Sequence, residues 1–115
     1  KILGAGPAGL TAAITLAKAR KNVLVYEIGK RPKPNFNLAV HSFRNYGREY
    51  NAVKRLEKIV KLPPMKRIYK VFKFSPSLKM CEIVSKKPIF YTFLRGNDKR
   101  SLESSLLAQA KKIRS

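Results

Sequence analysis

Three glycines near the start of the chain have the spacing of a backbone site for a diphosphate. Gly4, Gly6 and Gly9 fall within Gly-Ala-Gly-Pro-Ala-Gly, which matches the pattern G-x-G-x-x-G. In that pattern the first glycine permits a tight turn, the second lets the backbone approach phosphate oxygens, and the third allows a helix to pack closely on a strand. Free amides at the start of that helix, together with its dipole, attract negative charge. Pro7 and Ala8 complete the pattern, and Pro7 is tolerated because an early helical N–H has no partner within the helix.

The residues around the glycines supply the strand–helix–strand context that this motif requires. Residues 1–3 have the composition of the end of a strand, and residues 7–20 repeat apolar side chains at three- and four-residue steps, as a helix does. Residues 23–26 are a short β-prone run that predicts a buried parallel strand. Residues 1–30 are therefore predicted to be a βαβ dinucleotide-binding unit. A tight strand–turn–helix without a ligand is the alternative.

A carboxylate follows the second predicted strand. Glu27 stands 23 residues after Gly4, close to the ~20 residues at which an acid accepts hydrogen bonds from an adenosine ribose. A negative charge there would repel a 2′-phosphate, which disfavours NADP, whereas FAD and NAD both remain compatible. Lys30 and Arg31 could flank the adenine or the pyrophosphate, although a plain exposed loop is the simpler interpretation.

The rest of the chain predicts a small antiparallel sheet between two helices. Residues 29–37 contain turn residues and two prolines and predict a loop. Residues 49–62 and 101–113 have helical apolar spacing, and Ser101 is placed to cap the second of these helices. Because the three β-prone segments are joined by short connections, they are predicted to pair antiparallel; they are residues 68–74, 80–84 and 89–94.

The stretch at residues 4–13, followed by Val-Leu-Val-Tyr-Glu at 23–27, resembles the FAD-binding start of flavoprotein oxidoreductases. Residues 41–46, His-Ser-Phe-Arg-Asn-Tyr, are similar to a segment of the geranylgeranyl reductase group, which is related to the p-hydroxybenzoate hydroxylase class. Two further segments resemble the same group: Pro-Ile-Phe-Tyr-Thr-Phe-Leu-Arg-Gly at residues 88–96 and the helical segment at residues 101–110. This resemblance implies FAD as the cofactor and an apolar substrate, isoprenoid or aromatic.

The resemblance also implies a site residue outside the glycine loop. In that group an arginine after the strand lies beside the flavin, and here it would be Arg95, with Arg100 as its rival; a solvated loop cation is the alternative for either. Glu103 stands where the group commonly has Asp. A Gly-Asp motif that contacts the ribityl and pyrophosphate region does not occur in the sequence, so the remainder of the same polypeptide is expected to complete the flavin site.

Together these features predict an α/β fold: a Rossmann-like FAD/NAD(P)-binding domain whose βαβ unit and parallel sheet carry a small antiparallel β insert, incomplete at both ends. Residues 1–115 would be the N-terminal part of a single FAD-binding domain, with a β-rich substrate-side insert at about 63–95 and a returning helix at 101–114. The predicted function is that of a flavin-dependent oxidoreductase whose catalytic residues are not assigned. An NAD-dependent dehydrogenase is the alternative within the same class of enzymes.

The charge of the chain raises a different class of partner. It has 26 Lys and Arg against 6 Asp and Glu, a net charge of +20, and such an excess suggests nucleic acid or an anionic membrane surface. The basic residues are spread along the sequence and mostly alternate with apolar positions, as on a solvated face, so a compositional bias toward lysine is the simpler interpretation, and nucleic acid is not favoured. An anionic membrane surface remains open, and a basic nucleic-acid or membrane-surface module on a Rossmann-like core is the third hypothesis.

Several other residues carry no predicted chemistry. Cys81 is the single cysteine, which excludes an internal disulfide, and no metal site is expected. Cys81 is predicted to be core, and His41 an ordinary loop or partly buried residue. No segment approaches the ~18 apolar residues of a bilayer span and no signal peptide is evident, so a cytoplasmic location is expected. The aromatic residues of the β-prone segments are predicted to form sheet core or the wall of a substrate pocket: Tyr69, Phe72, Phe74, Phe90, Tyr91 and Phe93.

Overall fold

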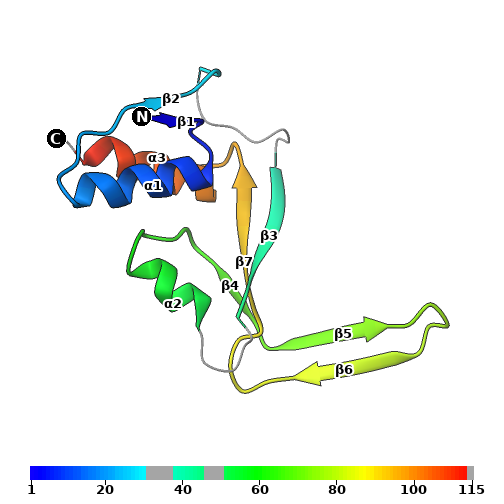
Figure 1. The fold of residues 1–115 in the computed structure, drawn as a ribbon. Helices are drawn as coiled ribbons and strands as arrows, with labels where there is room; N and C mark the ends of the chain where they lie inside the picture. Colours follow the sequence, from blue (N-terminus) through cyan, green and yellow to red (C-terminus); the bar gives the residue numbers. More distant parts are fainter. Residues whose placement is uncertain (31–37, 46–50, 114–115) are drawn as a thin grey trace.

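The computed structural model describes residues 1–30, 38–45 and 51–113 (Figure 1). β1 (Ile2–Leu3), α1 (Pro7–Lys18) and β2 (Val25–Tyr26) form the predicted βαβ unit, in which the two strands run parallel. These two strands are the whole parallel sheet within the described residues, so the full sheet of a Rossmann fold is not evident. The fold is mixed α/β with a small parallel sheet.

Antiparallel strands form the other part of the molecule. β7 (Phe90–Gly96) is the centre of a three-stranded sheet, with β3 (Leu38–Arg44) on one side and β4 (Lys66–Ile68) on the other. β5 (Lys70–Phe74) and β6 (Met80–Val84) pair only with each other. This hairpin extends from the end of the molecule opposite β1 and β2 (Figure 1). The predicted antiparallel pairing is therefore present, divided between two sheets.

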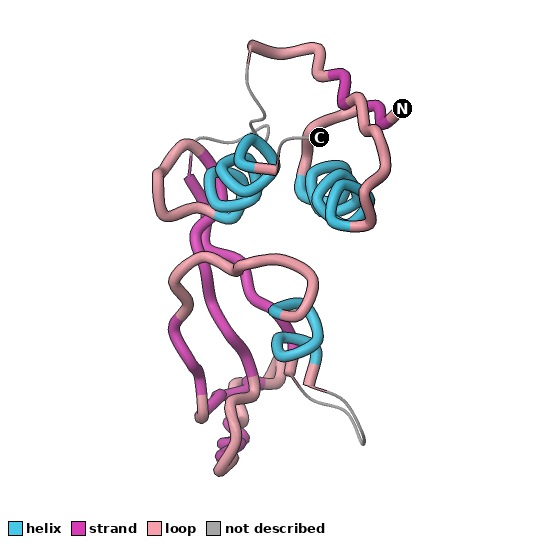
Figure 2. Tube along the Cα trace, turned by 90° about the vertical axis from the view of Figure 1, so that its left-hand side faces the viewer, coloured by secondary structure: helices cyan, strands magenta, loops and turns pink. Residues whose placement is uncertain are grey.

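One core joins the βαβ unit to the three-stranded sheet. α3 (Leu102–Lys112) packs against α1, and Figure 2 shows the helices at the same end of the molecule as the N-terminus. A single buried cluster takes residues from the loop before α1, from α1, from the turn after α2, from β7 and from α3: Ala5, Leu10, Ile14, Val60, Phe93, Leu102 and Leu106. The cluster places the C-terminal part of β7 on the same side of the fold as the glycines. None of the helices in the described ranges is long and apolar enough to cross a bilayer.

β3 is the element that the sequence pattern did not predict. Residues 41–46 were expected only as a segment leading into a helix, whereas Leu38–Arg44 is a seven-residue strand paired with β7 along its whole length. Only Ala39 and Phe43 of this strand are partly buried. The strand is thus stabilised by its partner more than by its own apolar alternation. Most of the loop predicted at 29–37 lies outside the described residues.

The boundaries of two predicted elements also differ. The helix predicted at 49–62 is shorter: α2 spans Ala52–Glu57, and residues 49 and 50 lie outside the described ranges. Beyond α2 the chain turns so that Val60, 3% exposed, enters the core. The strand predicted at 68–74 is divided into β4 and β5, because the first part pairs with β7 and the second with β6.

Some predictions of burial were wrong. β2 is not buried, since Val25 and Tyr26 are 36% and 49% exposed. Cys81 is exposed on β6 rather than part of the core. Phe72 and Phe74 are likewise exposed, whereas Phe93 of β7 is core. The reason is that the β5–β6 hairpin stands away from the rest of the described structure, so both of its faces contact solvent (Figure 1).

Candidate functional site

The chain passes from β1 into α1 through the glycine loop, residues 4–9. Gly4 has a φ of +91°, a conformation that side chains rarely adopt, and its N–H donates to the carbonyl of Tyr26 at 2.7 Å. A Cβ on Gly9 would lie 2.1 Å from the carbonyl oxygen of Gly4. Glycine is therefore required at both positions by the fold itself: one for the turn, the other for the close contact between helix and turn.

Gly6 differs from its two neighbours in the motif. Its φ and ψ are −72° and 178°, an extended conformation open to any residue, and an added Cβ would meet no described atom within 4 Å. Neither backbone strain nor crowding inside the protein requires a glycine here. Close approach of a ligand to the backbone would require one, and this is the role that the dinucleotide motif gives to its second glycine.

The start of α1 has no side-chain cap. Gly6 is the N-cap residue, Pro7 opens the helix, and the first turn contains no acidic residue. Gly6 has no side chain that could accept a hydrogen bond from the amides of α1, whereas Asn51 caps α2 and Ser101 caps α3 in this way. No residue of the first turn balances the partial positive charge at this helix end, and such an end favours phosphate oxygens.

Glu27 lies against the glycine loop, as its position after β2 suggested. Its Oε2 accepts a hydrogen bond from Ala5 N at 2.8 Å, and its Oε1 accepts one from Gly29 N at 3.0 Å. These backbone bonds, that of Ala5 first, hold the pKa of Glu27 below its ordinary 4.5. An ionised carboxylate therefore stands beside the loop at neutral pH, with acceptor capacity for a further donor. Lys30 is exposed, and Arg31 lies outside the described residues.

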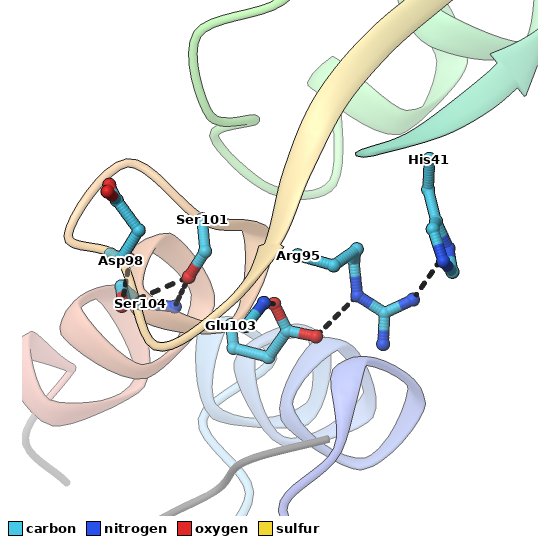
Figure 3. Close-up of polar contacts among 7 residues, drawn as sticks. His41, Arg95, Asp98, Ser101, Glu103 and Ser104 are labelled. Carbon is cyan, nitrogen blue, oxygen red and sulfur yellow. Dashed lines mark hydrogen bonds and ion pairs between the residues drawn. The ribbon is translucent and has the colours of Figure 1, made fainter. Parts of the chain in front are cut away.

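Arg95 takes part in an ion pair that the sequence did not predict (Figure 3). Its Nε donates to Oε1 of Glu103, and the backbone N–H of Gly96 donates to Oε2 at 3.1 Å. The side chain of Glu103 is 4% exposed and that of Arg95 is 18% exposed. Charge-assisted bonds of this kind fix the orientation of a guanidinium. The sequence did contain one indication of this pair: an acid, Glu103, in the first turn of a helix that follows a strand bearing Arg95. The turn that brings the two side chains together could not be predicted.

The other two candidate polar residues occupy different surroundings. His41 is exposed on β3 rather than in a loop, and its Nδ1 lies 3.2 Å from Nη1 of Arg95 (Figure 3). Its ring meets that of Phe93 edge to face, with centroids 6.4 Å apart. Arg100 pairs instead with Asp98, at 3.0 Å between Nε and Oδ1, and is 63% exposed. The hydrogen bond from the Arg100 side chain lowers the pKa of Asp98 to about 2.

An open, mostly apolar cavity of about 650 Å³ runs along α1. It begins at Pro7 and Ala8, next to the glycine loop, and is also lined by side chains such as Phe43, Leu56 and Leu102. Its described lining comes from α1, β3, α2 and its following turn, and α3, and includes no residue of 63–95, which was predicted to be the substrate side. The cavity nonetheless places an apolar surface directly beside the candidate phosphate site.

Comparison with known proteins agrees with this geometry at the N-terminus. Residues 2–56 match the family model of a NAD(P)-binding Rossmann-like domain, and this range contains the βαβ unit, the glycine loop and Glu27. No curated protein and no solved structure matches the chain significantly. The N-terminal part of the chain therefore carries a Rossmann-like dinucleotide-binding unit, consistent with an FAD- or NAD(P)-dependent oxidoreductase.

Proposed function

We propose that this chain is the FAD-binding part of a flavin-dependent oxidoreductase. The observation that carries the proposal is Gly6, a glycine that the fold does not need and that stands at the uncapped start of a helix. Its open surroundings fit a pyrophosphate held by the amides of the glycine loop. Bound FAD would supply the hydride or electron transfer. The chain's own residues bind and orient the cofactor.

Glu27 and Arg95 are the proposed contacts on either side of the pyrophosphate. Glu27 is ionised and already fixed by Ala5 N and Gly29 N, which suits it to accept from ribose hydroxyls. Arg95 would place positive charge on the flavin side, and Glu103 would hold its guanidinium in position. This role of Arg95 rests on the resemblance to geranylgeranyl reductases and on the position of Arg95 in β7, whose C-terminal part shares a core with the loop residue Ala5.

The proposed substrate is apolar, an isoprenoid or an aromatic compound. The support is the cavity beside Pro7 and Ala8, whose surface is almost entirely apolar. We also propose that further polypeptide covers the two-stranded parallel sheet and completes the flavin site. Residues in and next to that sheet support this, because Leu3 of β1 and the neighbouring Leu24 and Ile28 are all large, apolar and strongly exposed.

An NAD-dependent dehydrogenase is the second candidate. The matching family model is that of a NAD(P)-binding domain. A βαβ unit of this kind binds the pyrophosphate and the ribose of FAD and of NAD in the same way. The carboxylate of Glu27 disfavours NADP in either case, since a 2′-phosphate would meet a negative charge. The resemblance to flavoproteins over residues 4–13 favours FAD.

The deciding measurement is calorimetric titration with FAD, NAD and NADP of the purified full-length gene product, which includes the polypeptide proposed to complete the site. We expect FAD to bind more tightly than NAD, and NADP to bind most weakly. Preferential binding of NAD would establish the dehydrogenase instead. A protein that binds none of the three, and that is colourless as purified, would rule out both candidates.

A matched pair of variants tests the role of Glu27. Glu27→Gln removes the charge but keeps the shape, so FAD affinity should fall about tenfold, the usual effect of losing a hydrogen bond to a charged group. Glu57→Gln makes the same change at an exposed residue at the end of α2 and should leave the affinity unchanged. Equal effects of the two variants would show that Glu27 acts only through net charge.

A further inference from the structure

The β5–β6 hairpin has an unusual surface for an element in contact with water. Apart from Val71, every residue of its two strands is exposed. The exposed residues include large apolar side chains on the strands and at the tip: Phe72, Phe74, Leu78, Met80, Ile83 and Val84. By the strand register Phe72, Phe74, Met80 and Val84 share one face of the hairpin, and Ile83 lies on the other. Proteins rarely leave an apolar face of this kind in solvent unless it binds a partner.

The tip of the hairpin is the most unusual point. Leu78 has a φ of +60° and is 80% exposed. That conformation is one that glycine or asparagine normally adopts, and a bulky residue in it is an outlier. The turn is held by Ser75, whose N–H donates to the carbonyl of Lys79 at 2.9 Å and whose Oγ accepts from Lys79 N at 3.1 Å. An ordered turn therefore presents a leucine outward, at a position where local preference favours a small or polar residue.

The charge around this apolar tip has one sign. Residues 70–87 contain five lysines, one glutamate and no arginine. The glutamate, Glu82, is already paired with Lys70 at 2.9 Å. The remaining lysines are spread along the hairpin: Lys79 in the tip turn, Lys73 on β5, and Lys86 and Lys87 at the base.

We propose that this hairpin binds an anionic membrane surface, with its apolar tip entering the headgroup region. An apolar edge flanked by lysines is the pattern by which interfacial elements attach to such bilayers. Lysine stems can lie along apolar surface while their ammonium groups reach lipid phosphates. Nucleic acid fits less well, because the tip carries aliphatic Leu78 and Met80 and the hairpin has no arginine for phosphate or base contacts. The proposal does not depend on the identity of the cofactor.

The test is co-sedimentation of the full chain with vesicles of phosphatidylcholine alone or mixed with phosphatidylserine. Because a net charge of +20 gives some binding to any anionic surface, matched variants are needed. Leu78→Ser/Met80→Ser changes no charge, and Lys73→Gln/Lys79→Gln removes two positive charges from the hairpin. Lys111→Gln/Lys112→Gln removes the same charge from the last turn of α3.

We expect Lys73→Gln/Lys79→Gln to bind anionic vesicles at least tenfold more weakly, since each lysine near such a surface adds roughly fivefold. Leu78→Ser/Met80→Ser should bind at least tenfold more weakly because two apolar side chains no longer enter the headgroup region, and the α3 variant should change less than twofold. Circular dichroism establishes that each variant is folded. Similar losses in all three variants would overturn the proposal. The proposal would also be overturned if the hairpin variants still bind vesicles but no longer bind single-stranded RNA. The same holds if they still bind vesicles but no longer self-associate on a sizing column.

A fluorescent probe gives an independent reading, because the chain has no tryptophan. Leu78→Trp places a single indole at the tip, and Lys111→Trp places one on α3. On addition of anionic vesicles the first should shift to the blue and be quenched by brominated lipid, and the second should not. A tip indole that remains in water while the protein sediments with vesicles would contradict insertion.

Discussion

The three glycines of the loop serve different purposes, and exchanging two of them for alanine should separate binding from folding. Gly9→Ala would place a methyl group 2.1 Å from a backbone oxygen, well inside the 3.4 Å at which ordinary contact begins. Gly6→Ala would place the same group in open space at an ordinary φ. One substitution should therefore damage the fold, and the other should damage only the dinucleotide site.

The expected magnitudes follow from these contacts. Because the atom opposite Gly9 is backbone, it cannot move aside, and Gly9→Ala should cost about 3 kcal/mol, at the upper end for overpacking. For a domain of this size that lowers the melting temperature by roughly 10–15 °C. In Gly6→Ala the loss of a glycine N-cap costs about 0.5–1 kcal/mol. Alanine also lowers the conformational entropy of the unfolded chain, which stabilises the folded protein by a similar amount, about 0.4–1 kcal/mol.

The assay is thermal unfolding with and without FAD, combined with calorimetric titration. Gly6→Ala should melt within about 3 °C of the parent protein yet bind FAD about tenfold to a hundredfold more weakly, since its methyl group separates phosphate from the loop amides. Gly9→Ala should melt early in the absence of any ligand. The reasoning would be refuted by a Gly6→Ala protein that binds FAD normally, or by a Gly9→Ala protein as stable as the parent.

Three further predictions concern stability. Glu103→Gln leaves the guanidinium of Arg95 partly buried without its carboxylate and should cost about 2–4 kcal/mol in urea unfolding. The double variant Arg95→Met/Glu103→Gln should recover most of that loss, because it also removes the cation while the amide oxygen of Gln can still accept from Gly96 N. Leu106→Ala should cost about 2–5 kcal/mol because Leu106 is 1% exposed in the core, while Leu78→Ala at the hairpin tip should stay within about 0.5 kcal/mol. The pKa of Asp98 is lowered from 3.8 to about 2. The contribution of ionised Asp98 to folding stability is therefore complete above pH 3.8 and is lost as the pH falls toward 2. The amide NMR signal of Arg100 should follow that titration in the parent protein and should not do so in Asp98→Asn.

The βαβ unit could be predicted from sequence because its determinants are local. Gly4 and Gly9 are demanded by one turn and one contact, and both lie within the motif itself. The cap of α3 is local as well, since Ser101 Oγ accepts from Ser104 N at 3.2 Å. In each case the residues that fix the geometry are separated by a few positions, so their spacing alone carries the information.

The elements that were missed depend on distant partners. β3 has little apolar alternation and exists as a strand because β7, about fifty residues later, pairs with it. The Arg95–Glu103 pair forms because the turn after Gly96 brings α3 back over the end of β7. Cys81 and Phe74 alternate as core residues would, but no second layer covers the hairpin in the described structure. A periodic pattern indicates which face is apolar and does not indicate what covers it.

The glycine loop and the hairpin lie toward opposite ends of a molecule whose longest extent is 54 Å (Figure 1). Sites this far apart, with no shared partners, normally contribute to binding independently, within about 0.5 kcal/mol. Leu78→Ser/Met80→Ser should therefore bind FAD within about twofold of the parent protein, and Gly6→Ala should bind anionic vesicles as the parent does. Mutual dependence of the two activities would mean that lipid reaches the loop or that the cofactor orders the hairpin. In either case, the separation of the two sites that the fold implies would be wrong, even if each site were real.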